Sequence, residues 1–195
     1  MQEGGFCAWL WRRPRRWFLL GVPVGGFVTF IGGILASAIF LGGLHYTETL
    51  SFCTSCHEMQ QPLTELKQSF HWSNKVGIQP HCASCHVPPT FFAGIMRHLA
   101  AAKEVWGNLT GKLDTPEKYE ALRLEMAQSV WAELKANDSA ECRSCHTLAA
   151  MALDKQDPIA AKRHAPEYIA KTGKTCIDCH KGVVHEVPLG ADEAP

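Results

Sequence analysis

The sequence lacks a surplus of charge of either sign, since 19 Lys and Arg residues balance 19 Asp and Glu residues. Nucleic-acid-binding chains normally show a basic excess, so we expect no nucleic-acid partner. The bias of a disordered tail or a collagen-like fibre is also missing, because 46% of the 195 residues are apolar. Only one long hydrophobic run is present, which excludes a polytopic membrane protein. The two unusually frequent residue types are histidine, with 10 copies, and cysteine, with 9.

The hydrophobic run predicts a single membrane anchor. No Asp, Glu, Lys or Arg occurs from Trp17 to Thr47, and residues 18–44 are predominantly apolar. A helix of that length would reach about 40 Å, against about 30 Å for the hydrocarbon core of a bilayer. Pro23 lies in the first turns, where the loss of a backbone N–H costs least. We therefore predict one transmembrane helix over residues 18–44.

The residues that precede the run predict its orientation. They include four arginines and three tryptophans, namely Arg12, Arg13, Arg15, Arg16, Trp9, Trp11 and Trp17. By the positive-inside rule, residues 1–17 stay in the cytoplasm and residues 45–195 cross the bacterial inner membrane into the periplasm. The neutral total therefore divides into +3 for the first 17 residues and −3 for the remainder, which holds 15 basic and 18 acidic residues.

Two features of the run leave alternatives. Ala36-Ser37-Ala38 resembles a signal-peptidase site, but the apolar stretch before it is longer than a signal core and continues past it. An uncleaved anchor is therefore favoured over a signal peptide. Glycine pairs within the run permit close helix packing, so a homo-oligomer is an open alternative.

Eight of the nine cysteines fall into four C-x-x-C-H motifs. These are Cys53-Thr-Ser-Cys56-His57, Cys82-Ala-Ser-Cys85-His86, Cys142-Arg-Ser-Cys145-His146 and Cys176-Ile-Asp-Cys179-His180. The pattern is the signature of covalent haem c attachment. Both cysteines and the histidine share one side of a helical turn, so two thioether bonds hold the porphyrin edge while the imidazole reaches the iron. The motifs predict four covalently bound haem c groups, numbered haem 1 to haem 4 in chain order.

Cysteine pairs also bind zinc or form disulfides, and these readings compete with haem attachment. Neither chemistry requires a histidine directly after each pair, and four such coincidences have a chance on the order of 10⁻⁵. The compartment agrees as well, because haem c is attached on the side to which the anchor exports the motifs. The ninth cysteine, Cys7, lies on the predicted cytoplasmic side, where thiols stay reduced, and receives no role.

Further histidines are candidates for the second iron ligands. His71 and His164 lie 11 and 12 residues before the second motif of their own half, where a returning segment would cross a haem face. His185 lies five residues after the last motif, too near to reach its own haem but able to reach a neighbouring one. This arrangement indicates two diluted di-haem repeats, over about residues 48–110 and 137–190.

The first half lacks a counterpart of His185, and Met59 is the candidate that replaces it. Met59 lies two residues past the first motif, and a thioether can ligate haem iron. The alternative is that Met59 only fills space in the core. His45 and His81 are expected at the membrane exit and in solvent.

The chain between the two halves predicts helices and no strand. Phe91–Trp106 is rich in helix-forming residues, and Gly107 would end it. Thr115-Pro116-Glu117 is a start signal for a second helix that runs to about Ala136. We predict a mainly α fold, in which a compact tetrahaem domain follows the anchor. The haems would supply most of its core, so folding without them is not expected.

Five strings of the sequence identify a family resemblance. They are CHEM, CHVP, DTPEKYEALRLEMAQ, ECRSCH and TCIDCHKG, combined with one anchor and four motifs. The chain resembles the NapC/NirT family of membrane-anchored tetrahaem quinol dehydrogenases, which includes the NrfH branch, and is most similar to the NapC-type branch. The resemblance implies that electrons from membrane quinol pass through four haems to a periplasmic reductase, most often nitrate reductase. The alternative is a conduit to a nitrite or N-/S-oxide reductase without quinol oxidation of its own.

The resemblance also implies the iron ligands. Met59 matches the methionine that ligates the first haem in place of the motif histidine, while His164 matches a histidine of the NapC-type branch. The implied set is Met59 at haem 1, with His57 as the alternative ligand, His86 and His164 at haem 2, His146 and His185 at haem 3, and His180 and His71 at haem 4. Pro89 departs from the family, whose members commonly carry a histidine there.

A quinol pocket beside haem 1 is the last feature that the resemblance implies. Members tend to carry lysine where this chain has His98, followed by an acidic residue, here Glu104. We take His98, Lys103 and Glu104 as the candidate catalytic residues that bind the quinol hydroxyl and accept its proton. Imidazole suits this task because it exchanges protons near neutral pH. The alternative is that this stretch is a solvated helix face.

Overall fold

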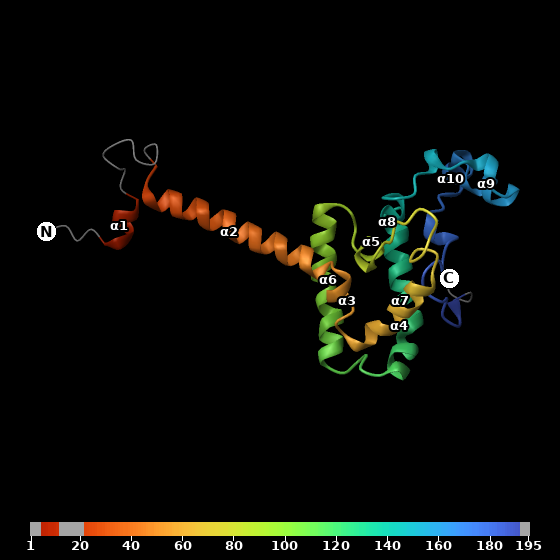
Figure 1. The fold of residues 1–195 in the computed structure, drawn as a ribbon, viewed down its shortest axis with the longest axis horizontal. Helices are drawn as coiled ribbons and strands as arrows, with labels where there is room; N and C mark the ends of the chain where they lie inside the picture. Colours follow the sequence, from red (N-terminus) through yellow and green to blue (C-terminus); the bar gives the residue numbers. More distant parts are fainter. Residues whose placement is uncertain (1–4, 12–21, 192–195) are drawn as a thin grey trace. The chain divides into compact units, whose positions relative to one another are not determined.

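A computed structural model of the protein describes residues 5–11 and 22–191 (Figure 1). Every regular element within these residues is helical and none is a strand, which confirms the predicted mainly α class. The chain divides into two compact units, residues 1–47 and residues 48–195.

The first unit contains α1 (Phe6–Leu10) and the long helix α2 (Val24–Thr47). α2 is the one helix within the described residues that is long and apolar enough to cross a membrane, and it is consistent with a single-pass anchor. Pro23 directly precedes its first residue, and the helix continues three residues past the predicted end at Leu44. The predicted span's residues 18–21 and the four arginines lie outside the described residues.

The second unit is built from short helices around two long ones. Its described elements are α3 (Leu50–Cys53), η2 (His57–Met59), α4 (Gln60–Gln68), α5 (Cys82–His86), α6 (Phe91–Leu109), α7 (Pro116–Ala136), α8 (Ala140–Arg143), η3 (Leu148–Ala150), η4 (Leu153–Lys155), α9 (Pro158–His164), α10 (Pro166–Thr172) and η5 (Cys176–Asp178), where η marks a 3₁₀ turn.

The two long helices α6 and α7 lie side by side and antiparallel (Figure 1). Arg97 Nε near the start of α6 is 3.6 Å from Glu133 Oε2 near the end of α7. α7 begins as predicted, because the Thr115 hydroxyl accepts the Lys118 backbone N–H at 3.3 Å. The predicted end of α6 at Gly107 is wrong, since the helix continues two residues further, to Leu109.

The apolar core formed by protein atoms alone is small. Within the described residues, the only buried hydrophobic residues are Leu66, Ala83, Ile177 and Ala191. Two of them, Ala83 and Ile177, lie inside the second and fourth C-x-x-C-H motifs. Most apolar surface of the unit therefore has no protein partner, which fits a domain whose core is completed by haem.

Candidate functional site

Each of the four motifs is part of a short helical turn. Cys53 ends α3, α5 contains the whole second motif, Cys142 lies in α8, and Cys176 begins η5. The last two motifs close with hydrogen bonds in which the histidine N–H donates to the first cysteine carbonyl, at 2.8 Å in His146 and 2.9 Å in His180. In these two motifs the local winding brings two thiols and one imidazole to the same side of the turn.

Neighbouring motifs meet through their cysteines. A hydrogen bond between the Cys53 and Cys82 side chains raises the pKa of Cys53 and lowers that of Cys82 to about 7. Burial raises the pKa of Cys85, and the charge of Cys145 adds to the effect. The first motif therefore lies next to the second, and the second lies next to the third.

The third and fourth motifs complete the series. Burial raises the pKa of Cys142 to about 11, with Cys176 as the next contributor. Ser139 fixes this junction: it is fully buried, has a left-handed backbone at φ 52°, and its hydroxyl accepts the Ile177 N–H at 3.3 Å. The left-handed turn redirects the chain from the end of α7 into α8, so Ser139 couples the third motif to the fourth.

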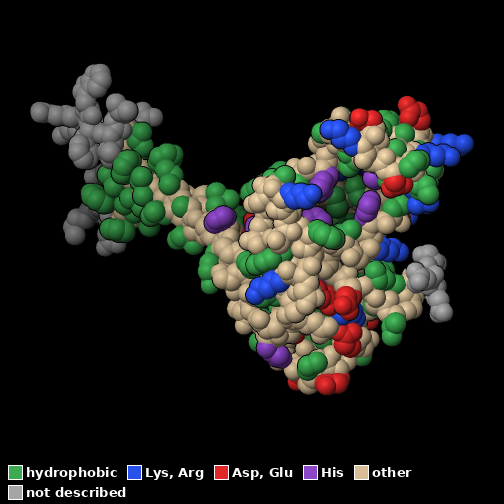
Figure 2. Space-filling view, turned by 45° about the vertical axis from the view of Figure 1, so that its right-hand side comes forward, with side chains coloured by type: hydrophobic (Ala, Val, Ile, Leu, Met, Phe, Trp, Pro, Cys, Tyr) green, Lys and Arg blue, Asp and Glu red, His purple; other side chains and the backbone are tan. Residues whose placement is uncertain are grey.

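Three motif histidines each face one histidine from elsewhere in the chain. The ring centroids are 6.2 Å apart for His86 and His185, 6.3 Å for His146 and His71, and 5.9 Å for His180 and His164. Figure 2 shows histidine side chains around an apolar hollow on one face of this unit.

The spacing of these pairs fits haem iron. Two imidazoles on opposite faces of one iron, each with a nitrogen about 2 Å from the metal, have centroids about 6 Å apart. Iron binding also requires neutral imidazole. Burial lowers the pKa of His86 to about 4, and burial likewise lowers the pKa of His180 and His185. The residues present therefore suit a bis-histidine haem at the second, third and fourth motifs.

The three pairs differ from those that the resemblance implied. His164 faces the fourth motif instead of the second, His185 the second instead of the third, and His71 the third instead of the fourth. The same six histidines take part in both pairings, and which of them share an iron stays a prediction. The cause of the difference is the path of the chain after the fourth motif. This segment runs back to Glu65 in α4 and Arg123 in α7, so His185 lies by the second motif instead of the third.

The first motif has a different environment. Both ring nitrogens of His57 face protein oxygens, with Nε2 at 3.0 Å from the Asp114 carbonyl and Nδ1 at 3.2 Å from Glu58 Oε2. The His57 side chain is 66% exposed. Met59, two residues further along, is half-buried at the end of η2. This orientation favours Met59 over His57 as an iron ligand.

A hollow of about 310 Å³ adjoins the second motif between α6 and α7. Cys85 and His86 line one side, and mostly apolar residues of both helices line the rest. Arg97 also lines it, and its buried Nη1 has no hydrogen-bond partner within the described residues. Apolar walls with one unpaired guanidinium nitrogen suit a macrocycle that carries carboxylates.

The predicted quinol residues do not come together as a group. His98 Nδ1 contacts the Gly94 carbonyl at 2.8 Å, and His98 Nε2 is 3.8 Å from Glu48 Oε1. Glu104 instead binds Arg97 at 3.0 Å, because a six-residue separation places it about 120° around the helix from His98. Lys103 is exposed.

Glu48 was missed by sequence reasoning, although it is the first charged residue after the apolar run. Its charge also contributes to raising the pKa of Cys53, after the hydrogen bond to Cys82, burial and the charge of Cys82. Glu48 therefore lies within electrostatic reach of both His98 and the first motif.

Comparison with known proteins identifies the family. Residues 15–190 match the NapC/NirT cytochrome c family, N-terminal region. The chain belongs to the NapC/NirT cytochrome c family. The cytochrome c-type protein NapC of Haemophilus influenzae is 45% identical over 181 residues, which cover 92% of this chain and 88% of that protein.

Two further relatives extend this comparison. NapC of Paracoccus pantotrophus is 44% identical over 192 residues, covering 94% of this chain and 78% of that protein. The denitrification system component NirT of Stutzerimonas stutzeri is 41% identical over 197 residues, covering 98% and 94%. No solved structure matches the chain. The four cysteine pairs of this NapC/NirT cytochrome are consistent with c-type haem binding.

Proposed function

We propose that the protein oxidises membrane quinol and passes the electrons through four covalently bound haem c groups to a periplasmic reductase. Attached haem c supplies reversible one-electron transfer. The observation that carries the proposal is the unbroken series of motif contacts, which begins beside Glu48 and ends beside the α9–α10 helices. The helix α2 then serves as a single-pass inner-membrane anchor, with the N-terminus in the cytoplasm and the haem domain in the periplasm.

The ligand set follows from the facing rings. We assign His86 with His185 to haem 2, His146 with His71 to haem 3, His180 with His164 to haem 4, and Met59 to haem 1. The attachment residues are the eight motif cysteines, Cys53, Cys56, Cys82, Cys85, Cys142, Cys145, Cys176 and Cys179.

Quinol chemistry requires a proton acceptor beside the first haem. His98 and Glu48 supply it, because they lie 3.8 Å apart and Glu48 is near Cys53. His98 is held by the Gly94 carbonyl, so its Nε2 is directed at Glu48. In this arrangement His98 hydrogen-bonds a quinol hydroxyl and Glu48 receives the proton.

The surface beside His98 suits an apolar substrate. Phe91, Val105 and Leu109 are exposed and lie seven residues before, seven residues after and eleven residues after His98, so they share its face of α6. Lys103 lies about 140° around the helix from His98. Glu48, which faces His98, directly follows Thr47, the last residue of α2, along the chain. An apolar face around His98 suits the apolar ring and tail of a quinol.

Replacing Glu48 by Gln should slow quinol-driven haem reduction by about 100-fold, because loss of a general base costs about 10²–10⁴ in rate. Dithionite reduction of all haems should stay unchanged. Stopped-flow absorbance with a quinol analogue measures the rate. A loss in Glu104→Gln but none in Glu48→Gln would contradict the assignment and return the role to Glu104.

The exit is expected at the fourth motif, where exposed cations collect (Figure 2). Five exposed cations on and around α9 and α10 have no ion pair within the described residues; they are Lys155, Lys162, Arg163, Lys171 and Lys174. Nearby, Asp157 caps α9 and Asp178 binds Lys135, so two local carboxylates are already engaged. Asp154 and Glu167 are also exposed here, so five cations face three acidic residues between residues 154 and 174. This basic excess suits a reductase with an acidic docking surface.

The double variant Lys162→Glu/Arg163→Glu should slow electron transfer to the reductase at least about tenfold at low salt, because steering charges raise association rates by about 10–10³. Quinol-driven haem reduction should be unaffected. Lys67→Glu/Lys112→Glu, which makes the same charge change elsewhere, is the control. Equal effects of the two variants on the reductase rate would show that only net charge matters.

Nitrate reductase is the partner we favour, since the NapC-named relatives cover most of the chain. The alternative function is an electron conduit to a nitrite or N-/S-oxide reductase that accepts electrons from another membrane complex. The two functions differ in one property: only a quinol dehydrogenase is reduced by quinol directly.

A further inference from the structure

Each facing pair contains one histidine from outside the motifs, and these three histidines differ in the hydrogen-bond partner of their Nδ1. His185 Nδ1 is 3.2 Å from the carboxylate oxygen Oε2 of Glu65. His164 Nδ1 is 2.7 Å from the amide oxygen of Gln156. His71 Nδ1 is buried and has no partner within the described residues. The partners are thus a carboxylate, a neutral amide and none.

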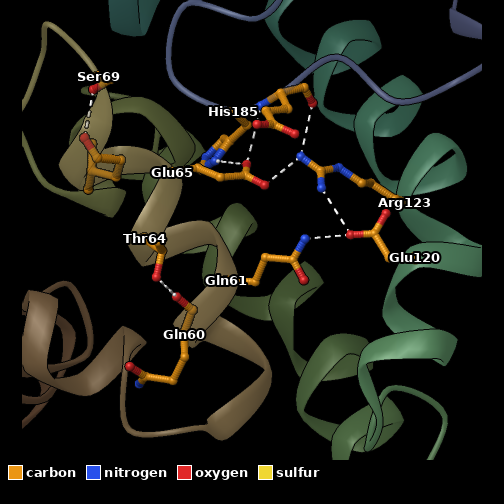
Figure 3. A network of polar contacts seen from close by, with 10 residues as sticks. Gln60, Gln61, Thr64, Glu65, Ser69, Glu120, Arg123 and His185 are labelled. Atoms are coloured by element: carbon orange, nitrogen blue, oxygen red, sulfur yellow. Dashed lines mark hydrogen bonds and ion pairs between the residues drawn. The ribbon is translucent and has the colours of Figure 1, made fainter.

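The carboxylate of Glu65 is itself built into the fold (Figure 3). Glu65 is 8% exposed, and its Oε1 accepts a hydrogen bond from Arg123 Nη2 at 2.6 Å. Its Oε2 accepts the Glu186 backbone N–H at 3.3 Å, and the Arg123 Nη2 also donates to the Glu186 carbonyl at 3.0 Å. The side chain therefore holds one orientation, and the same contacts fix the segment that carries His185.

The contacts of Glu65 decide the tautomer of His185. A carboxylate that binds a guanidinium accepts hydrogen bonds and donates none, and Glu65 accepts from Arg123 Nη2. His185 Nδ1 therefore carries the proton and donates it to Glu65, so its Nε2 is left with a lone pair for the iron. A carboxylate behind a ligating histidine fixes the ring and makes it a stronger electron donor.

We propose that Glu65 is a positioning residue that makes haem 2 the lowest-potential of the three bis-histidine haems. Stronger donation from His185 stabilises ferric over ferrous iron, and second-sphere hydrogen bonding is one of the ways in which proteins set haem potentials. Gln156, as a neutral acceptor, gives haem 4 an intermediate potential, and His71 leaves haem 3 the highest. This inference rests on the haem ligation in the proposed function but needs neither quinol nor reductase.

The test is a redox titration of the purified full-length holoprotein, followed by absorbance and low-temperature EPR. In Glu65→Gln, the lowest of the three bis-histidine potentials should rise, with at least a tenfold change in that reduction equilibrium, which is 59 mV for one electron. The reduction potentials of the other haems should stay unchanged. Glu65→Asp, which keeps the charge, should recover part of the shift. Glu120→Gln is the matched control, because Glu120 binds the same guanidinium at 3.0 Å but does not contact His185.

A second variant keeps the proposal testable if loss of the Glu65 carboxylate prevents folding. Gln156→Glu places a carboxylate behind His164, so the potential of a different haem should fall. Unchanged potentials in both variants, or an equal shift of all four haems, would overturn the proposal. Fewer than three bis-histidine low-spin EPR signals in the unmodified protein would instead overturn the ligand assignment on which it rests.

Discussion

Replacing His164 by alanine should convert one of the three bis-histidine haems completely from low-spin to high-spin. The ring of His164 lies 5.9 Å from that of His180, so its loss leaves the iron at the fourth motif with one axial ligand. His71→Ala and His185→Ala should each convert a different haem. EPR of the oxidised protein counts the low-spin signals that remain.

His81→Ala is the control for this series, because His81 lies outside the three facing pairs and is exposed. All low-spin signals should persist in it. The pairing would be contradicted by two of the three distal variants removing the same signal. A fully low-spin His164→Ala protein would show that His164 is not a ligand.

Loss of haem attachment should have the largest effect on stability. Cys142→Ser/Cys145→Ser removes the attachment cysteines of the third of the four motifs, and the described residues bury only four hydrophobic residues without haem. Because cofactor binding then supplies much of the folding free energy, we expect the variant to lose at least about 5 kcal/mol, the stability of a marginal domain. Denaturant unfolding followed by circular dichroism measures this loss.

Cys7→Ser is the matched control, since Cys7 is the one cysteine outside the motifs. Its unfolding free energy should equal that of the unmodified protein. A Cys142→Ser/Cys145→Ser protein that unfolds at the same denaturant concentration would contradict the claim that the haems complete the core.

Local sequence signals were sufficient for the features that depend on neighbouring residues. The motifs, the helical class and the start of α7 at Thr115-Pro116 depend on hydrogen bonds within one turn, and the structure has both the helices and the cap. The end of α6 was mispredicted at Gly107 because the helix continues past this glycine for two residues. The Gly107 carbonyl accepts a hydrogen bond from the Lys112 N–H at 2.8 Å.

Distant contacts decided the features that sequence reasoning missed. His185 faces the second motif because Glu65 and Arg123, 120 and 62 positions earlier, hold the backbone of the next residue. His98 meets Glu48, 50 positions earlier, instead of Glu104. A buried carboxylate in the polar segment Gln60–Gln68 has no local signature, so neither partner was predictable from spacing along the chain.

The most direct test of the account is the fraction of haem that quinol alone reduces. The full-length protein would be placed in lipid nanodiscs, and the haem absorbance after quinol addition compared with that after dithionite. We expect quinol to reduce a substantial share of the haem, and periplasmic nitrate reductase with nitrate to reoxidise it. No reduction by any quinol in protein that dithionite reduces fully would contradict it.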